Sequence, residues 1–422
     1  MYALVDCNNF FVSCERVFDS TLEGKPVIVL SNNDGCAIAR SSEAKALGIK
    51  MGANFFEIED LVKQHNVQVF STNFVLYADF SMRVKGLLSD FCPEVEDYSI
   101  DESFLCFNGF QNFNLKEHCE KISKTVRQGT GIPVSIGIAP TKTLSKVANK
   151  FAKKYSAYKN VCMIDTDEKR IKALKGFEIS DVWGIGWQHT KRLTSMGVKT
   201  AFDFTQLPKA WVRKHMTVMG ERTWSELHGI PCIAMETSPP PKQTIMVSRS
   251  FGKMIEDFTT VSEAVSTYTA MAAAKLRKQK SCAAQMLVFI DTNPYRNDLP
   301  QYSQHIVMTL PVATNSTQEL LYYALEGLKK IFCPNYFYKK AGVMMMDICS
   351  ENAVQGSLFD KVDRRKHKSL MKVLDTVNDR YGRNTLKIAC MGDGKAWQIK
   401  QERLSPCYTT RISDFPKVTI NH

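Results

Sequence analysis

Residues 95–107 read Val-Glu-Asp-Tyr-Ser-Ile-Asp-Glu-Ser-Phe-Leu-Cys-Phe, so two adjacent carboxylates, Asp101 and Glu102, lie in an apolar, strand-like stretch. Buried carboxylates are costly unless they bind cations or accept hydrogen bonds. A third carboxylate, Asp6, ends the apolar strand expected at 2–6. Three such groups could hold two Mg²⁺ ions for phosphoryl transfer. Spacing alone favours ordinary acids on an exposed edge or turn, and the adjacent pair converges only if the strand bends or ends there.

Strands and helices alternate around this stretch. Apolar residues at every second position predict a strand at 134–139, and a helix follows the Pro-Thr break after it. The other elements expected in this part are a strand at 27–30 and helices at 41–47 and 115–127. The alternation over residues 1–165 predicts an α/β or α+β domain.

The helix after the Pro-Thr break has an apolar face and a cationic face. The cationic face carries Lys142, Lys146, Lys150 and Lys153. Directed at a triphosphate, such a face would neutralise the charge that develops during phosphoryl transfer. The commoner meaning of this pattern is a solvated helix surface, and both interpretations stay open from the sequence.

A Gly-apolar-Gly turn, Gly184-Ile185-Gly186, lies among the helical segments of residues 166–230. Lys191 and Arg192 follow it in the next helical segment. Exposed backbone N–H groups at such a turn, together with a helix N-terminus, can bind phosphate without reading bases. A tight turn inside a helical core is the alternative.

The second half of the chain begins after a proline-rich linker, Ser238–Lys242. Residues 243–348 again alternate, which predicts a second α+β domain. Its expected elements are strands at 285–290 and 342–348 and helices at 264–278 and 318–331. Beyond residue 350 the chain turns polar and basic. The pentapeptide Gln355-Gly356-Ser357-Leu358-Phe359 lies there, and it could fill an apolar pocket on a partner, form a buried turn or be a lone apolar pair.

Composition and charge bound the class of protein. The 422 residues correspond to roughly three domains, and a hydrophobic fraction of 44% excludes a mainly disordered chain. The formal net charge is +12, with −1 on residues 1–165 and +13 on residues 166–422. A basic region of this size favours nucleic acid as the partner, although a merely soluble basic surface is about as compatible with the charge.

Membrane insertion, secretion and disulfide frameworks are not expected. No apolar run approaches the ~20 residues that span a bilayer, and the N-terminus lacks the basic segment of a signal peptide. The thirteen cysteines include no C-x-x-C pair, which indicates reduced thiols, no common zinc site and a cytoplasmic protein.

Several motifs in one order resemble the Y-family of DNA polymerases. They are Asp6, Ser99–Glu102, Gly137–Lys142 and Gly184–Gly186. Further segments look like the UmuC-type catalytic subunits of bacterial DNA polymerase V, and this likeness extends through the tail. These segments are Leu30–Cys36, Asp181–Gly186, Ser248–Gly252 and Ser405–Arg411.

The resemblance implies an α+β multidomain, right-hand polymerase. Its implied parts are a ferredoxin-like palm (1–20 and 71–165), small fingers (21–70), a helical thumb with a helix-hairpin-helix (166–235), a linker (236–242), an α/β little finger (243–348) and a C-terminal partner-binding tail (349–422). Asp6, Asp101, Glu102 and the backbone carbonyl of Cys7 would hold two Mg²⁺ ions.

The resemblance also implies the residues that bind nucleotide and DNA. The phosphates would be held by backbone amides near Phe10 and Phe11 and by Lys153, and Phe11 matches the steric gate that collides with a ribose 2′-hydroxyl. The gate is often Tyr in this group. Ser42 and Lys45 fall where some relatives place Tyr and Arg on the triphosphate, so Lys45 keeps the charge without the bidentate fork. The implied DNA contacts are Gly184, Ile185, Gly186, Lys191, Arg192 and Arg249.

The implied function is error-prone translesion DNA synthesis in the SOS response, on primer-template DNA with deoxynucleoside triphosphates. Gln355, Leu358 and Phe359 look like a sliding-clamp peptide. The family's partners also include a UmuD′-like dimer and the RecA filament, which implies a cytoplasmic protein associated with the nucleoid when active. The alternatives are a catalytically weak DNA-binding scaffold that recruits other factors and a nuclease or nucleotidyl cyclase that uses the same carboxylates.

Overall fold

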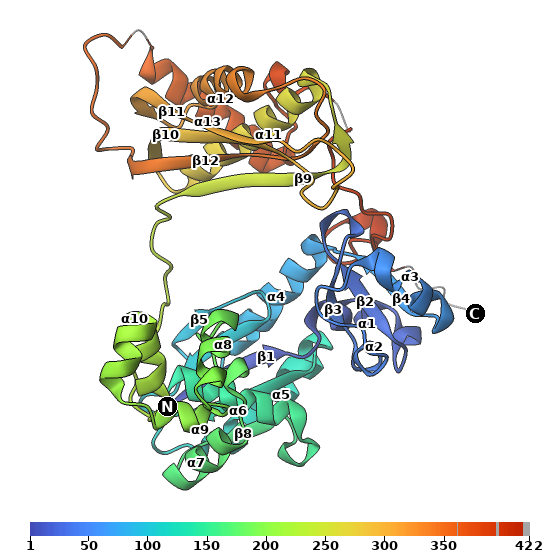
Figure 1. Cartoon of the computed structure of the whole chain (residues 1–422), viewed down its shortest axis with the longest axis vertical. Coiled ribbons are helices and arrows are strands. Elements are labelled where there is room, and N and C mark those ends of the chain that lie inside the picture. The colour runs from blue at the N-terminus through green and yellow to red at the C-terminus, as the bar shows by residue number, and fades with distance from the viewer. Residues whose placement is uncertain (361, 394–395, 417–422) are drawn as a thin grey trace. The chain divides into compact units, whose positions relative to one another are not determined.

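The computed structural model describes residues 1–360, 362–393 and 396–416, which form two compact units (Figure 1). Unit 1 contains Met1–Pro239 together with the residues from Glu402 onward, and unit 2 contains Pro240–Gln401. Each unit encloses its own hydrophobic core. The chain therefore passes from one unit to the other twice, and the last described residues belong to the first.

The centre of unit 1 is a five-stranded sheet in the order β5-β6-β1-β7-β8. Its strands are β1 (Tyr2–Cys7), β5 (Val95–Asp97), β6 (Glu102–Cys106), β7 (Val134–Ala139) and β8 (Val161–Met163). β1 runs antiparallel to both β6 and β7, and β8 runs parallel to β7. The strand-like stretch at 95–107 is thus two antiparallel strands with a turn between them.

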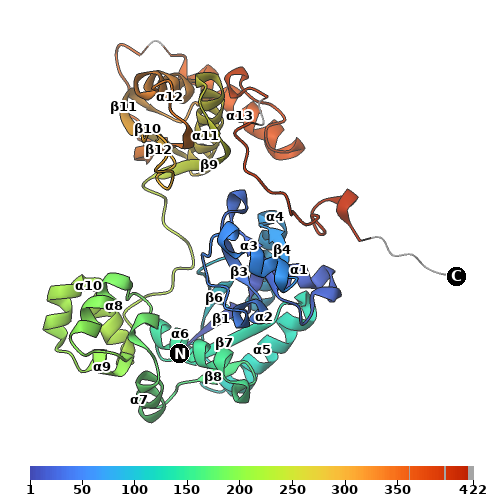
Figure 2. The same cartoon turned by 45° about the vertical axis from the view of Figure 1, so that its right-hand side comes forward.

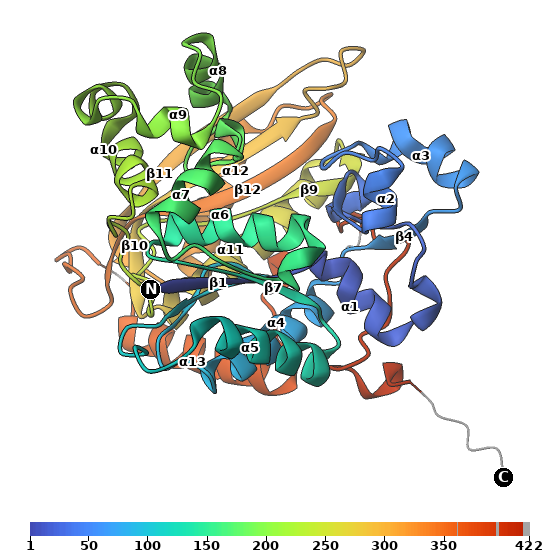
Figure 3. The ribbon, with the colours of Figure 1, turned by 90° about the horizontal axis from the view of Figure 1, so that it is seen from below.

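Helices cover both faces of this sheet (Figure 3). One face packs against α1 (Phe10–Phe18), α4 (Phe74–Ser89) and α5 (Leu115–Thr130), and the other packs against α6 (Lys142–Lys154). The core with α4 and α5 takes alternate residues of β1, Ala3, Val5 and Cys7. Leu4 and Asp6 therefore point to the face that α6 covers.

Gly137 in β7 allows α6 to lie directly on the sheet. A Cβ at this position would lie 2.1 Å from the backbone nitrogen of Asn149 and 2.2 Å from the carbonyl oxygen of Ser145. The Asn149 side chain donates hydrogen bonds to the carbonyl oxygens of Leu4 and Ser135. This close approach sets the position of the α6 lysines relative to the strand that ends with Asp6.

A smaller sheet of three strands packs beside α1 in unit 1 (Figure 2). It contains β2 (Val27–Leu30), β3 (Ala37–Arg40) and β4 (Gln68–Ser71), with α2 (Ser42–Ala46) and α3 (Phe55–Gln64) packed on its core. β2 pairs antiparallel with β3 and parallel with β4.

The remaining helices of unit 1 share a core with α6. They are α7 (Asp167–Lys175), α8 (Trp187–Ser195), α9 (Ala201–Thr205) and α10 (Lys209–Leu227). Short 3₁₀ turns occur in both units at Ser20–Leu22, Asn32–Asp34, Ser156–Tyr158, Ile179–Asp181, Ala389–Met391 and Ile412–Asp414.

Unit 2 is built on a four-stranded antiparallel sheet in the order β11-β10-β12-β9. Its strands are β9 (Ile245–Ile255), β10 (Ser281–Thr292), β11 (Ser303–Thr314) and β12 (Tyr338–Ser350), with helices α11 (Phe258–Lys278), α12 (Thr317–Ile331) and α13 (Arg364–Tyr381). The Arg277 guanidinium binds both carboxylate oxygens of Asp375 at 2.6 and 2.7 Å. The polar sequence after residue 350 is therefore in part a folded portion of this unit.

These sheets and helices confirm the predicted α+β multidomain class. None of the described helices is long and apolar enough to cross a membrane. All thirteen cysteines are unpaired, as the sequence indicates. The division into palm, fingers, thumb, linker, little finger and tail stays a prediction, because the two units of the structure are a coarser division than these six parts.

Candidate active site on the central sheet

Asp6 and Glu102 lie opposite each other on neighbouring strands. They are direct partners in the antiparallel register of β1 and β6, so both side chains leave the same face of the sheet. Asp101 stands immediately before β6, and its carbonyl oxygen accepts a hydrogen bond from the amide of Cys7 at 2.9 Å. The two adjacent carboxylates can therefore converge, because β6 begins at Glu102 and Asp101 lies in the turn before it.

Ser99 fixes the turn that presents these two acids. Its hydroxyl donates to Asp101 Oδ1 at 2.6 Å and accepts hydrogen bonds from the amides of Asp101 at 3.3 Å and Glu102 at 3.0 Å. The amide of Ser99 in turn donates to the carbonyl of Glu102 at 3.0 Å. The Ser-Ile-Asp-Glu motif is thus a closed turn, which supports side-chain positions that a continuous strand could not provide.

Two lysines of α6 bind the carboxylates directly. Lys153 Nζ lies 2.5 Å from Asp6 Oδ2, and Lys146 Nζ lies 3.0 Å from both Glu102 oxygens. Lys146 also lies 4.4 Å from the ring centre of Tyr98 and 5.4 Å from that of Trp183. The Trp183 indole donates to the Tyr98 hydroxyl at 3.1 Å, so this aromatic pair connects the segment before the Gly-Ile-Gly turn to Glu102.

The other two lysines of the predicted cationic face, Lys142 and Lys150, have acid partners outside the carboxylate site. Lys142 is only 1% exposed, ion-pairs with Glu96 and donates to the carbonyl of Ala234 at 2.7 Å. Lys150 pairs with Asp181. The four lysines of this face pair with acids from different segments of unit 1; Lys142 is buried, whereas Lys150 is exposed.

The donor chemistry of the site suits a hard divalent cation. Burial raises the pKa of the Asp6 carboxyl to about 6 against the opposing effect of Lys153, and Glu102 and Asp101 act in the same direction as burial. A cation relieves such an arrangement, and carboxylate and carbonyl oxygens are the ligands that Mg²⁺ prefers. Burial also raises the pKa of the Cys7 thiol, so this residue has only its backbone carbonyl to offer.

The described residues contain no group of three His, Cys, Asp or Glu side chains already arranged around one metal position. The ammonium groups of Lys146 and Lys153 contact the oxygens that a metal would need. Metal binding at Asp6 and Glu102 therefore requires that these two ammonium groups move away from the carboxylates. The residues fit the ion by donor type, and the ammonium groups of Lys146 and Lys153 balance the charge of the two carboxylates.

A cluster of cations surrounds the start of α1, beside Asp6. Asn9 precedes this helix in a left-handed conformation with φ of 47°, which Asn tolerates better than most residues. Its side-chain oxygen accepts a hydrogen bond from Lys45 Nζ at 2.6 Å, and its amide donates to Ser42 Oγ at 3.5 Å. The pKa of Lys45 is lowered mainly by burial and further by the nearby charges of Arg40 and Lys153.

The structure thus brings Ser42, Lys45 and Lys153 together with Asp6. The sequence interpretation missed Asn9, which orders the contact, and Arg40, which adds charge. The only signal for Asn9 was an Asn pair directly before a helix. Nothing in the local sequence indicated Arg40, because its position follows from the pairing of β2 with β3.

Phe10 and Phe11 begin α1 and differ in their surroundings. Phe10 is 4% exposed and lies in the hydrophobic core. Phe11 is half-buried and stacks on Tyr77, with ring centres 4.4 Å apart and planes at 14°. Phe74 meets the Phe11 ring edge-on at 6.2 Å. Phe11 is therefore the ring whose outer surface can meet a ligand, and Tyr77 and Phe74 support it from α4.

The Gly184–Gly186 turn has features of both a tight turn in a helical core and an exposed turn at a helix N-terminus. Ile185 is 5% exposed and belongs to a core, whereas Gly186 is the N-cap of α8. Gly184 has φ of 89°, a conformation that favours glycine. Lys191 and Arg192 are exposed on α8, so the turn is anchored by its apolar residue and followed by cations at the surface.

Arg249 lies on β9 in unit 2, where it is half-buried. The pKa of Lys275 on α11 is lowered mainly by burial and further by Lys242, Arg249 and Arg383. These four side chains form a cationic cluster within unit 2. Arg383 was not predicted, because it comes from the segment after α13 and is distant in sequence from the other three.

The pentapeptide Gln355–Phe359 is exposed and has no regular secondary structure. Leu358 is 100% exposed and Phe359 is 90% exposed. This exposure rules out the buried turn that the sequence left open. Two neighbouring large apolar side chains in solvent are the kind of surface that a partner pocket can cover.

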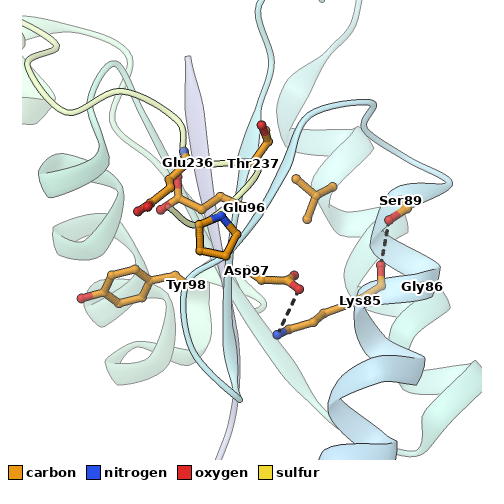
Figure 4. A pocket seen from close by; sticks show the side chains of 10 residues that line it. Lys85, Gly86, Ser89, Glu96, Asp97, Tyr98, Glu236 and Thr237 are labelled. Carbon is orange, nitrogen blue, oxygen red and sulfur yellow. Dashed lines mark hydrogen bonds and ion pairs between the residues drawn. The ribbon is translucent and has the colours of Figure 1, made fainter. Parts of the chain in front are cut away.

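A cavity of about 540 Å³ in unit 1 lies between α4, β5 and the start of the linker (Figure 4). Glu96 projects toward Glu236, whose amide donates to the Glu96 carboxylate at 2.7 Å. Lys85 of α4 pairs with Asp97 of β5 at 3.5 Å, so this ion pair joins two of the elements that line the cavity. The cavity lining includes none of the predicted site residues, so it is separate from the carboxylate site.

A solved structure shares the fold of this chain. A Y-family DNA polymerase chimera of Dbh and Dpo4 matches with a TM-score of 0.64, covering 83% of this chain and 99% of the other at 19% identity. The fold is that of the Y-family DNA polymerases.

Sequence comparisons place the chain within a particular family. The profile of the impB/mucB/samB family matches residues 5–150, and that of the family's C-terminal domain matches residues 242–358. The chain is 40% identical to "Protein ImpB" of Salmonella typhimurium over 99% of both chains. It is 41% identical to "Protein UmuC" of Salmonella typhimurium LT2 over 99% of this chain and 100% of that protein. The chain belongs to the impB/mucB/samB family.

More distant similarity extends to "DNA polymerase IV 2" of Bacillus subtilis, at 25% identity over 90% of this chain and 91% of that protein. A domain of unknown function matches residues 368–418. This last match includes α13 of unit 2 and the described residues from Glu402 onward, which belong to unit 1.

Proposed function

We propose that the protein is a template-directed, error-prone translesion DNA polymerase that adds deoxynucleotides to a primer 3′-hydroxyl as part of the SOS response. The observation that carries the proposal is the pairing of Asp6 with Glu102 across β1 and β6, beside Lys45 and Lys153, on a Y-family polymerase fold. Acidic oxygens next to a cationic cluster are the arrangement that a metal-bound triphosphate requires.

Different residues of the site have different roles in nucleotide addition. Two Mg²⁺ ions held by Asp6, Asp101, Glu102 and the Cys7 carbonyl would lower the pKa of the primer hydroxyl and neutralise the triphosphate. Lys45, Lys153 and the amides at the start of α1 hold the phosphates. The supported ring of Phe11 lies against the sugar and excludes a 2′-hydroxyl.

The segments of the right hand follow the sequence boundaries. Residues 1–20 and 71–165 form the palm, 21–70 the fingers, 166–235 the thumb, 243–348 the little finger and 349–422 the tail. The family's open site makes little contact with the nascent base pair. Weak shape checking tolerates damaged templates and costs fidelity, because discrimination arises from differences in transition-state binding.

DNA contacts are assigned to the Gly184–Gly186 turn with Lys191 and Arg192, and to Arg249 in the cationic cluster of unit 2. Backbone amides and exposed cations bind phosphates without reading sequence, which a polymerase needs. Affinity for primer-template DNA therefore weakens steeply as salt is raised.

Replacing Lys191 and Arg192 together with Ala is expected to weaken primer-template binding by roughly 10-fold at moderate salt and to reduce the slope of log affinity against log salt by about two. Fluorescence anisotropy over a salt series measures both quantities. The matched control replaces Lys121 and Lys124, two exposed lysines of α5, with Ala. An unchanged slope in the first variant would remove α8 from the DNA interface.

The proposed protein partners rest on an exposed peptide and on the resemblance to UmuC-type subunits. Gln355, Leu358 and Phe359 form a sliding-clamp peptide, supported by the full exposure of its two apolar side chains. A UmuD′-like dimer and a RecA filament are proposed as further partners, on the basis of the resemblance to UmuC-type subunits.

Replacing Leu358 and Phe359 with Ala is expected to lower clamp-stimulated synthesis to the level measured without clamp, because the apolar anchors carry most of the contact energy. Basal synthesis remains unchanged, since neither side chain contacts the carboxylate site. Primer extension with and without the clamp measures this ratio. The control removes two other exposed apolar side chains, Leu370 and Val373 of α13. Equal loss of basal and stimulated synthesis would indicate a folding role instead.

Product analysis on a primed template tests the proposed function against its alternatives. A polymerase lengthens the labelled primer in a Mg²⁺-dependent reaction. A nuclease shortens it, and a catalytically weak scaffold binds it without changing its length even when UmuD′-like and RecA-like partners are supplied. Lengthened strands support the proposal, and either of the other results contradicts it.

A further inference from the structure

The C-terminal strap, Glu402–Tyr408, returns to unit 1 and pairs with the strand that leads into α4. The amide of Ser71 in β4 donates to the carbonyl of Arg403 at 2.9 Å, and the amide of Arg403 donates to Ser71 Oγ at 2.9 Å. The Tyr408 ring stacks on Phe18 of α1, with ring centres 4.4 Å apart. The strap therefore contacts β4, which leads into α4, and α1, which carries Phe11, although 332 to 390 residues separate the contacting pairs in sequence.

Asn73 joins the strap to the beginning of α4. Its side-chain amide donates to the carbonyl of Ser405 at 3.0 Å, to Ser405 Oγ at 3.1 Å and to the carbonyl of Pro406 at 3.2 Å. Its side-chain oxygen accepts from the amide of Leu76 at 3.2 Å and so caps α4. Phe74 and Tyr77, the two rings that support Phe11, lie in the turn that this cap secures.

Glu15 forms a second and more direct connection. Its Oε1 accepts hydrogen bonds from the Tyr77 hydroxyl at 2.6 Å and from the Ser405 hydroxyl at 3.0 Å. Glu15 is 2% exposed, and the part of the chain that the structure describes gives it no ion pair. Burial raises the pKa of this carboxyl, whereas the two hydroxyl donors lower it. A buried carboxylate held by two hydroxyls depends strongly on each of them.

We propose that Ser405 is a positioning residue for sugar discrimination, which holds the Phe11 ring in place through Glu15 and Tyr77. The proposal rests on the proposed function, in which Phe11 excludes a ribose 2′-hydroxyl. The strap belongs to the segment matched by the domain of unknown function, so this segment has a role inside the catalytic unit in addition to any partner contacts.

The chain of contacts predicts an effect on specificity that differs from a general loss of stability. In the hydrogen bonds described for it, Ser405 contacts none of the proposed metal-binding carboxylates Asp6, Asp101 and Glu102, and neither Lys45 nor Lys153. If Tyr77 becomes more mobile, the Phe11 ring stacked on it can move away from a ribose 2′-hydroxyl. Incorporation of deoxynucleotides changes less, because they have no 2′-hydroxyl to collide with the ring. The ratio of kcat/KM for a deoxynucleotide to that for the matching ribonucleotide is the quantity that must change.

Ser405→Ala is expected to lower this ratio about 5- to 10-fold, since one buried hydrogen bond to a charged group is lost. Ser405→Thr keeps a hydroxyl and is expected to restore the ratio to within about 2-fold. Tyr77→Phe keeps the stacked ring and removes the other donor to Glu15. Its effect combined with Ser405→Ala is expected to be non-additive, because both changes act on one carboxylate.

Ser413→Ala is the matched control, because it removes a hydroxyl of the same C-terminal region whose one hydrogen bond among the described residues goes to neighbouring Asp414. It is expected to leave the ratio unchanged. An unchanged ratio in Ser405→Ala, or an equal loss of activity on both sugars, would overturn the proposal and leave Ser405 with a purely structural role.

Hydrogen exchange provides a readout that does not depend on synthesis. In the full-length protein, Ser405→Ala is expected to increase exchange at the amides of residues 74–80, and Ser413→Ala is not. Increased exchange in a chain that extends no primer would support the positioning contact and reject the polymerase function. Unchanged exchange at 74–80 would reject the positioning contact, whatever the activity.

Discussion

Asp101→Asn is expected to reduce primer extension on the order of 10³-fold or more, while affinity for primer-template DNA stays within a few-fold. A metal ion supplies several kcal/mol of transition-state stabilisation, and about 1.4 kcal/mol corresponds to a factor of ten in rate. The amide has the shape of the carboxylate and keeps one oxygen for the hydrogen bond from Ser99, so the turn before β6 survives. Only the negative charge on the proposed metal ligand is lost.

Asp97→Asn is the matched control for this experiment. Asp97 ends β5, five positions from Glu102, and its side chain is 64% exposed; among the described residues it pairs with Lys85 alone, at 3.5 Å. Single-turnover extension with saturating DNA compares the two variants, and anisotropy measures DNA affinity separately. Extension by a clean Asp101→Asn preparation at a rate near that of the unmodified protein would remove Asp101 from the metal site.

Phe11→Ala is expected to increase ribonucleotide incorporation relative to deoxynucleotide incorporation by about 10²-fold. The ring is held against Tyr77 at 4.4 Å and cannot rotate away without losing this stack. A rigid apolar wall discriminates against one additional hydroxyl through steric exclusion, and pockets of this kind reach factors of 10 to about 200. Because Phe11 lacks the hydroxyl of the more common Tyr, the whole effect is assigned to the ring.

Competition between matched ribonucleoside and deoxynucleoside triphosphates, with alkali cleavage of the products, measures the Phe11→Ala ratio. Phe113→Ala removes an exposed ring before α5 and is the control. A ratio equal to that of the unmodified protein would place the gate at another residue. In that case hydrogen exchange would still test whether Ser405 positions Tyr77, but this contact would have no role in sugar discrimination.

Local patterns in the sequence predicted the elements that place the site. Apolar alternation set the strand at 134–139 to the same bounds as β7, and the helices at 264–278 and 318–331 fall within α11 and α12. These elements are amphipathic or fully buried, so their side-chain period is visible in the sequence. The long strands β9 and β11 were not predicted, because their alternation is interrupted by polar and charged residues.

Contacts between distant segments could not be predicted from the sequence. The spacing of the α6 lysines gave a common face, but not that Lys142 is buried against Glu96 or that Lys146 is held among aromatic rings. The order of strands in the sheet determines which residues lie beside these two lysines. The strap at Ser405 was also missed, since its partners Glu15 and Asn73 lie more than 300 residues earlier in the chain.

Mg²⁺-dependent primer extension across a single abasic site is the most direct test of translesion synthesis. The full chain is assayed with and without the sliding clamp, a UmuD′-like dimer and a RecA-like filament, and Asp101→Asn is run beside it. We expect strands that extend past the abasic position with the unmodified chain and none with the variant. Strands that stop at the primer under every condition, or strands of equal length with both proteins, would contradict this expectation.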